Sequence, residues 1–146
     1  QTFVGNHDVD RIASVVGPEG AALAAVLLFT LPGVPSIYYG DEQAFTGVKG
    51  EGFSADDPVR PPLPATPEGL APLGQWMYEL HQGLIAARRR HPWLVHARVE
   101  VLETENEAIS YRVHSGDDSL TVHLTIEPTM SARLEFSDGE TAEYSW

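Results

Sequence analysis

The sequence predicts an α/β part over residues 1–94 and an antiparallel all-β domain over residues 95–146. Three observations support this division. First, two short apolar segments each end in polar or acidic side chains, and an apolar helical segment separates them, as in two consecutive βα units. Second, a long segment rich in Gly, Pro and Asp follows them. Third, from Ala97 the hydrophobic period changes from about 3.6 to about 2, the spacing of a strand with one buried face.

The first βα unit begins with residues 3–5, which are apolar or small and predict a buried strand over about residues 2–5. The strand ends abruptly at Asn6-His7-Asp8, three polar groups able to hydrogen-bond a ligand or bear charge. Gly17-Pro18-Glu19 is typical of a helix start, since Pro is tolerated at the first helical position and Glu favours the first turn. The helix from Pro18 to Leu31 is apolar almost all round and is expected to be buried.

The second βα unit has the same form. Gly33 and Pro35 end the helix, and residues 34–39 predict a strand that runs into Asp41 and Glu42. When parallel strands are followed by helices, chemistry gathers at their carboxyl ends, so the polar ends of both strands are expected to meet. Two readings of Asp41 and Glu42 stay open: they line a binding subsite, or they sit at a loop start.

The next part of the chain contains a long connection and a second helix. Residues 43–64 have no periodicity, and connections this long are uncommon and are often functional or poorly ordered. Thr66-Pro67-Glu68 is typical of a helix start, and His91-Pro92 closes the helix. An apolar stripe at helical spacing indicates packing of this helix against a sheet. The stripe consists of Leu73, Trp76, Met77, Leu80 and Leu84.

Four segments of the second domain alternate apolar and polar residues. Turn residues at Ser115-Gly116-Asp117-Asp118 and Ser137-Asp138-Gly139-Glu140 separate some of them. The pattern predicts an antiparallel meander or a sandwich-like domain with one buried face. The residues expected to face inward are Val99, Val101, Ile109, Tyr111, Val113, Leu120, Val122, Leu124, Leu134 and Phe136.

Composition limits the classes of partner. The formal net charge is -12, which argues against nucleic acid because phosphate binding needs clustered Lys and Arg. The one basic cluster, Arg88-Arg89-Arg90, is expected to complement a helix dipole. No apolar run of membrane-spanning length is apparent, since residues 21–31 are too few, so no membrane partner is expected.

The ends and the cysteine content of the chain give two further expectations. The chain has no cysteine, which excludes disulfides and thiolate metal sites and favours a reducing compartment such as the cytoplasm. It opens at Gln1 within a predicted strand, without an initiator Met or a signal peptide. The chain is therefore expected to be a fragment, with any targeting signal in the part that precedes it.

Two segments carry a resemblance to a known family. Residues 3–8 (FVGNHD) followed by Arg11 resemble the seventh-strand motif of the α-amylase family, glycoside hydrolase family 13. Residues 31–42 (LPGVPSIYYGDE) are similar to the eighth-strand segment of that family, and residues 56–61 (DDPVRP) resemble a loop of some bacterial members. The all-β part resembles the family's C-terminal domain. The resemblance implies the last two βα units of a TIM (β/α)8 barrel, followed by that domain.

The resemblance also implies a function: a retaining enzyme that acts on α-glucosidic bonds of starch-like or maltodextrin-like substrates. The family's nucleophile and acid come from the fourth and fifth strands, which this chain lacks, so the chain alone is expected to be catalytically incomplete. Asp8 matches the third family carboxylate, which stabilises the positive transition state. His7 matches the histidine that hydrogen-bonds the same sugar, Asn6 matches a supporting residue, and Arg11 is expected to brace the loop. No cofactor or metal ligand is identifiable in this chain, and calcium in the intact parent stays open.

Other readings of the same residues stay open. Asp8 could be only a helix or turn cap, and His7, Asp8 and Asp10 could be metal ligands of a phosphohydrolase. On the family scaffold, transglycosylation competes with hydrolysis, since water and sugar acceptors differ only in subsite details. A non-catalytic carbohydrate-binding or structural fragment is a further alternative. Two barrel strands cannot close a barrel, so the isolated chain is expected to self-associate through its first third.

Overall fold

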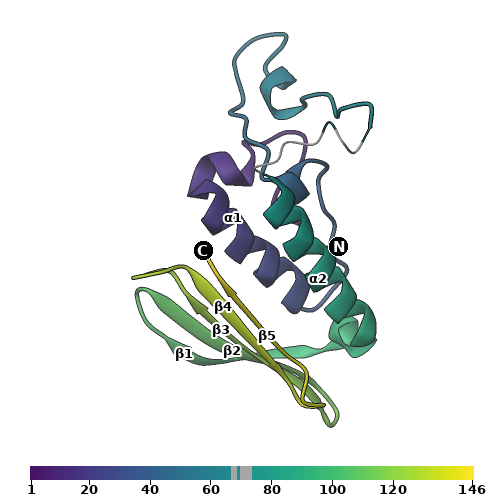
Figure 1. Ribbon diagram of the computed structural model, residues 1–146, viewed down its shortest axis with the longest axis vertical. Coiled ribbons are helices and arrows are strands. Elements are labelled where there is room, and N and C mark those ends of the chain that lie inside the picture. The colour runs from purple at the N-terminus through teal and green to yellow at the C-terminus, as the bar shows by residue number, and fades with distance from the viewer. Residues whose placement is uncertain (67–68, 70–73) are drawn as a thin grey trace.

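The computed structural model describes residues 1–66, 69 and 74–146. Two helices form a layer over one face of an antiparallel sheet, and a long connection extends away from them at the opposite end (Figure 1). The helices are α1 (Ile12–Thr30) and α2 (Gln75–Arg90), with short 3-10 helices η1 (Asp41–Gln43), η2 (Asp57–Val59) and η5 (Pro92–His96). The strands are β1 (Arg98–Thr104), β2 (Ala108–Ser115), β3 (Asp118–Thr125), β4 (Ser131–Phe136) and β5 (Thr141–Ser145). The predicted order, a helical first part and then an antiparallel β part, is confirmed.

Helix α1 consists of two helical segments joined at a kink. Gly17 has φ 76° and ψ 167°, outside the helical region, and Pro18 follows it. Proline favours such a break because it lacks the backbone N–H that would continue the hydrogen-bond ladder. The residues from Pro18 onward form the predicted helix, which ends at Thr30, and an additional turn that starts at Ile12 precedes the kink.

Helix α1 is also the central element of the core. Its buried residues include Ala22, Val26 and Phe29, which belong to a core shared with α2 and the sheet. By length and composition, α1 is the one helix among the described residues that could cross a membrane. The expectation that no segment is long enough is therefore wrong, because the helix begins nine residues before Ala21. Buried core helices meet the same criterion, so it is weak evidence for a membrane.

The two predicted barrel strands lie side by side and parallel, but they do not form regular strands. Thr2 makes an isolated parallel bridge to the second segment. Thr2 N–H donates to Val34 O (2.9 Å), and Ser36 N–H donates to Thr2 O (2.8 Å). The predicted parallel neighbours are confirmed, and the prediction of regular strands is wrong. A barrel strand is hydrogen-bonded on both edges, whereas the described residues provide one parallel neighbour to each segment.

Helix α2 carries the predicted apolar stripe. The buried members of the stripe are Met77, Leu80 and Leu84. Trp76 is half-buried against the same core, and the helix ends before His91, as predicted. The predicted helix start at Pro67 and Glu68, and the stripe residue Leu73, lie outside the described residues.

The basic cluster at the end of α2, Arg88-Arg89-Arg90, forms hydrogen bonds to other elements of the fold. Arg88 Nη1 donates to the carbonyl oxygens of Phe29 (2.6 Å) and Leu31 (3.0 Å) at the end of α1. Helix ends leave such carbonyls without helical partners, so Arg88 caps α1 and complements its dipole rather than that of its own helix. Arg90 donates to both carboxylate oxygens of Glu140, at 2.8 and 2.5 Å, and ties α2 to the β4–β5 turn.

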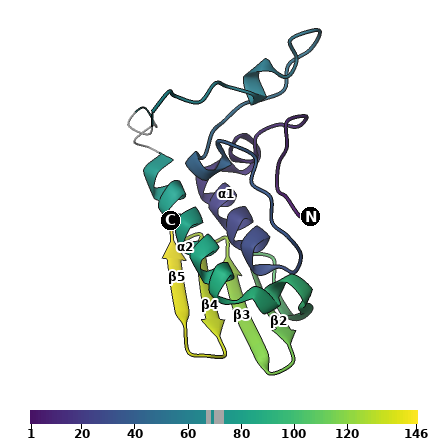
Figure 2. The ribbon, with the colours of Figure 1, turned by 90° about the vertical axis from the view of Figure 1, so that its right-hand side faces the viewer.

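The described strands form one sheet, in which β1 to β5 are hydrogen-bonded in sequence order. Of the two predicted forms, this is the meander, and its second layer consists of helices that lie over one face (Figure 2). Most of the residues expected to face inward are buried. These are Tyr111, Val113, Leu120, Val122, Leu124, Leu134 and Phe136. Ile109 is half-buried against the same core.

Val99 and Val101 are exceptions, with relative exposures of 43% and 59%. The register places them opposite Val113 and Tyr111, so they point to the core face as predicted. Their strand β1 is the edge of the sheet, and all its residues are exposed. The prediction that Val99 and Val101 are buried is therefore wrong. Alternation predicts the face of a side chain, whereas burial requires another element to cover that face.

A buried hydrogen bond joins α1 to the sheet. Thr30 Oγ1 donates to Val26 O (2.7 Å), so the 2.5 Å contact between Thr30 Oγ1 and the hydroxyl of Tyr111 has the tyrosine as donor. Burial raises the pKa of Tyr111 to about 12. The neutral phenol is therefore the form that the folded state prefers.

Stability is expected to fall between pH 10 and pH 12, and Tyr111→Phe is expected to reduce this loss. The unfolded chain releases the phenol proton near about pH 10, whereas the folded state keeps it to about 12. The folded state binds more protons than the unfolded chain in this window. The contribution of Tyr111 to the free energy of unfolding is therefore complete below pH 10 and falls by about 1.4 kcal/mol per pH unit between pH 10 and pH 12. Chemical denaturation across the window measures the difference between wild type and variant. Identical pH slopes would contradict the prediction, with the more exposed Tyr78→Phe as control.

Candidate functional site

The segment Asn6-His7-Asp8 follows the first parallel segment and is open to solvent. Asn6 Oδ1 accepts a hydrogen bond from Asp8 N–H (2.8 Å), which fixes an Asx turn. His7 Nε2 lies 3.3 Å from Asp8 Oδ2, and the two side chains are 61% and 59% exposed. The three residues predicted from the sequence therefore lie together at the carboxyl end of that segment.

The long connection after η1 folds back onto this segment. Arg60 Nη2 lies 3.2 Å from Asp8 Oδ1, and Arg60 Nε donates to His7 O (3.1 Å). Lys49 Nζ donates to Asp8 O (3.1 Å). Asp56 forms ion pairs with both cations, at 2.6 Å from Arg60 Nη2 and 3.0 Å from Lys49 Nζ. The base of the connection is thus tied to the predicted site, which favours the functional reading of this long segment.

Asp56 is the residue that holds the two cations in place. The hydrogen bond from Lys49 and the charge of Arg60 lower the pKa of Asp56, so its carboxylate stays ionised at neutral pH. The sequence analysis missed Lys49 and Arg60, because they are 41 and 52 residues from Asp8 along the chain. The loop motif at residues 56–61 contains Arg60 and could have indicated it, whereas no sequence motif contains Lys49.

Arg11 is a buried charge that joins the two parallel segments and the connection. Its guanidinium donates to Asp41 Oδ1 (2.9 Å), Tyr39 O (2.6 Å) and Val59 O (3.0 Å). It also lies 4.1 Å from the centre of the Tyr38 ring, a cation–π contact. Arg11 is 1% exposed, and a charge this deeply buried requires such partners. The expected bracing role of Arg11 is confirmed.

Asp41 and Glu42 lie at the start of the loop, and their hydrogen bonds favour the second of the two open readings. Asp41 is buried beside Arg11; burial raises the pKa of Asp41, and the hydrogen bond from Arg11 works against that rise. Glu42 accepts hydrogen bonds from Gly40 N–H (2.8 Å) and from Gln43 Nε2 (3.0 Å). Both carboxylates are thus engaged in shaping the segment that leads into η1.

The alternative roles of Asp8 fit the geometry less well. The N-cap of α1 is Arg11, which makes no side-chain cap bond, so Asp8 does not cap that helix. Asp10 Oδ1 accepts Lys49 N–H (2.7 Å) and is engaged by the connection. With the cationic Lys49 and Arg60 at their side, His7, Asp8 and Asp10 do not form a set of converging metal ligands.

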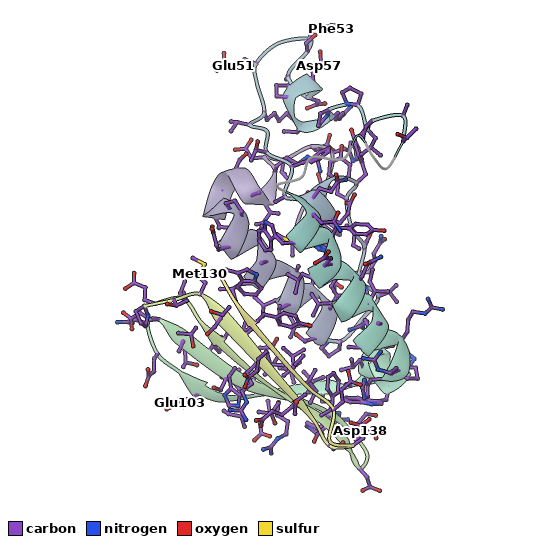
Figure 3. The ribbon with its side chains drawn as sticks, in the orientation of Figure 1. Glu51, Phe53, Asp57, Glu103, Met130 and Asp138 are labelled. Carbon is purple, nitrogen blue, oxygen red and sulfur yellow. The ribbon has the colours of Figure 1, made fainter. Side chains whose placement is uncertain are left out.

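A different cluster has the spacing of metal ligands. His91, Asp138 and Glu140 offer ligand atoms within 4.8 Å of one another, in the part of the chain that the structure describes. Asp138 lies at the opposite end of the molecule from Asp57, which belongs to the connection (Figure 3). His91 Nε2 lies 3.0 Å from Asp138 Oδ2, and Arg90 pairs with Glu140. Both carboxylates are thus held by neighbouring side chains, so the cluster is a contact between α2 and the sheet.

Comparison with known proteins gives the family. The description "Alpha amylase, catalytic domain" matches residues 1–79. The chain belongs to the α-amylase family. A 4-alpha-glucanotransferase of Thermotoga maritima is 29% identical to this α-amylase family chain, covering 82% of the chain and 33% of the relative. An alpha-amylase of Niallia circulans is 52% identical over 48 residues, 32% of this chain and 9% of that enzyme.

Solved structures of the α-amylase family show the same fold. The cyclic alpha-maltosyl-(1→6)-maltose hydrolase of Arthrobacter globiformis superposes with a TM-score of 0.73 at 22% identity, over 99% of this chain and 34% of that chain. The chain therefore contains the last two βα units of a TIM barrel and the β domain that follows them. It spans about a third of the length of the Thermotoga relative. The resemblance seen in the two strand motifs is confirmed.

Proposed function

We propose that this chain is the C-terminal part of a retaining enzyme that acts on α-glucans such as starch or maltodextrins. Hydrolysis is the leading reaction. The observation that supports it best is the exposed Asn6-His7-Asp8 segment, with Asp8 held by Arg60, in a chain that matches the α-amylase catalytic domain. In this proposal Asp8 stabilises the transition state, and His7 and Asn6 bind the sugar.

The proposed role of Asp8 follows from the charges of its carboxylate and of the transition state. Glycoside cleavage passes through an oxocarbenium-like centre, so a fixed carboxylate close to it stabilises the transition state more than the ground state. Arg60 pairs with the Asp8 carboxylate and the Asx turn engages the Asp8 backbone N–H, while 59% of the Asp8 side chain stays open to a ligand. A retaining mechanism also needs a nucleophile and an acid about 5–5.5 Å apart, which the rest of the enzyme would provide.

Transglycosylation is the second candidate, and one comparison favours it. The 4-alpha-glucanotransferase of Thermotoga maritima matches 82% of this chain, whereas the alpha-amylase of Niallia circulans matches 32%. Incubation of the full-length protein with maltoheptaose separates the candidates. Hydrolysis increases the number of reducing ends, whereas transfer produces longer maltooligosaccharides at a constant number. Binding without any new product would favour a non-catalytic carbohydrate-binding protein.

Arg60 is expected to be a positioning residue for Asp8. In the full-length enzyme, Arg60→Ala should lower kcat by about 10–10²-fold and change KM less, because a misplaced group weakens transition-state contacts most. Arg60→Lys keeps the charge but loses the forked contacts to Asp8, His7 and Asp56, so an intermediate kcat is expected. Arg112→Ala, on the exposed face of the sheet, is the control. An unchanged kcat in Arg60→Ala would contradict this role.

The isolated 146-residue chain is expected to be inactive on α-glucosides and to self-associate. It carries Asp8 alone of the three family carboxylates, and Phe3 and Val34, in the two parallel segments, are 54% and 57% exposed. Unpaired strand edges beside such residues invite pairing with a second copy. Light scattering and a maltoside assay test both points. A stable monomer at high concentration, or maltoside cleavage by the pure chain, would contradict them.

A further inference from the structure

A surface recess of about 810 Å³ lies where five parts of the chain meet. Its wall consists of the kink of α1, the end of η1 and the residues after it, Pro61 and Pro62 of the long connection, the start of α2 and Trp146. Its aromatic lining residues are Phe45, Trp76 and Trp146. The C-terminus lies beside the first turns of α2 (Figure 2). The recess shares no lining residue with the Asn6-His7-Asp8 segment.

Two tryptophans form a fixed notch at this recess. The rings of Trp76 and Trp146 lie 6.4 Å apart at 49°, and both side chains are half-buried. Tyr144 lies parallel to Trp146, at 6.1 Å and 5°. The backbone N–H of Trp146 donates to Met130 O (3.0 Å), which anchors the end of the chain. Rings held in this way offer apolar contact area at a low cost in conformational entropy.

The wall of the recess also carries polar groups. Gln43 is 6% exposed, and its Nε2 donates to Glu42 Oε1 (3.0 Å). Its Oε1 accepts no hydrogen bond from any described residue, although a buried acceptor without a donor is costly. Gly74 packs closely on Gln43, since an added Cβ would lie 2.7 Å from Gln43 O. Glu19 is exposed at the recess and forms no ion pair within the described residues.

We propose that this recess binds an α-glucan chain, as a second carbohydrate site. Pyranose rings have apolar C–H faces that pack on aromatic rings, and hydroxyls at their edges that need polar partners. The tryptophan notch meets the first requirement, and Gln43 and Glu19 meet the second. The volume lies within the range of about 300–1,000 Å³ that is usual for small-molecule sites. The choice of an α-glucan as the ligand rests on the proposed function.

Tryptophan fluorescence of the 146-residue chain, titrated with maltoheptaose, tests this site without any turnover. Saturable binding is expected, and Trp76→Ala and Trp146→Ala should each weaken it at least 10-fold. Trp93→Phe should leave the affinity unchanged, because Trp93 lies beside His91 and outside the recess. Circular dichroism of each variant identifies loss of folding. Glu19→Ala, an exposed change, gives a second test and should weaken binding several-fold.

Further measurements distinguish binding at the recess from binding at the proposed catalytic site. Binding that persists in Trp76→Ala and Trp146→Ala but is lost in His7→Ala would belong to the Asn6-His7-Asp8 segment and would overturn the assignment to the recess. No saturable binding of maltoheptaose, or binding that survives both tryptophan changes, would also overturn it. Equal affinity for cellohexaose, which has β-linkages, would overturn the specificity for α-glucans. None of these results depends on whether Asp8 functions in catalysis, which the kinetics of the full-length enzyme test.

Discussion

Asp8→Asn is expected to lower kcat of the full-length enzyme on maltooligosaccharides by about 10²–10⁴-fold, as for other preorganised electrostatic groups. The change is isosteric and removes the negative charge, and the side chain is 59% exposed, so the fold should be unaffected. Because the carboxylate would act mainly on the cationic transition state, kcat should fall more than KM rises. Steady-state kinetics with maltoheptaose, together with a melting profile, measure both quantities.

A neighbouring carboxylate provides the matched control. Asp10 Oδ1 accepts Lys49 N–H, and Asp10→Asn keeps that acceptor, so its kcat should stay close to the wild-type value. His7→Ala should be milder than Asp8→Asn and should weaken sugar binding as well as rate. If Asp8→Asn folds normally and retains most of its activity, the assignment of Asp8 as transition-state stabiliser is wrong.

Val122→Asp is expected to unfold the chain. Val122 is fully buried in the centre of the sheet, opposite Tyr111 on β2 and Leu134 on β4. Burying an unpaired carboxylate costs several kcal/mol, which is comparable to the total stability of a domain, about 5–15 kcal/mol. The sheet shares one core with α1 and α2, so the loss should extend to the helices. Circular dichroism against temperature measures the effect.

The next residue of the same strand provides the control. His123 lies on the opposite, exposed face of β3, opposite Arg133 on β4, so His123→Asp should keep a melting profile close to wild type. A wild-type profile in Val122→Asp would refute the alternation argument for this domain. Unfolding in both variants would point to a general intolerance of charge in the strand rather than to burial.

Features that depend on neighbouring residues were predicted well. The end of α2 at His91 and the turns of the sheet follow from the backbone preferences of Gly, Pro and Asp, and Gly17-Pro18, predicted as a helix start, is a kink inside α1. The core face of the strands follows from alternation, because successive side chains point to opposite sides. The family, and with it the candidate site Asn6-His7-Asp8, follows from two short motifs.

Features that depend on contacts between residues far apart in the chain were not predicted from the sequence. The support of Asp8 by Arg60 and Lys49 spans 52 and 41 residues, and no local pattern relates such positions. Val99 and Val101 point to the predicted face but stay exposed, because β1 is the edge of the sheet. The recess at Trp76 likewise exists only because the C-terminus returns to the start of α2.

The sequence by itself determined the family, the order of the elements, the faces of the strands and the identity of the candidate site residues. These properties depend on residue type and on spacings within a few positions, which a sequence displays directly. Only the tertiary structure decided which faces are covered, which charges surround Asp8, and that Asp41 is buried with Arg11 rather than open to a ligand. Burial and electrostatics depend on distances through space, and these arise when segments that are far apart in the chain come into contact.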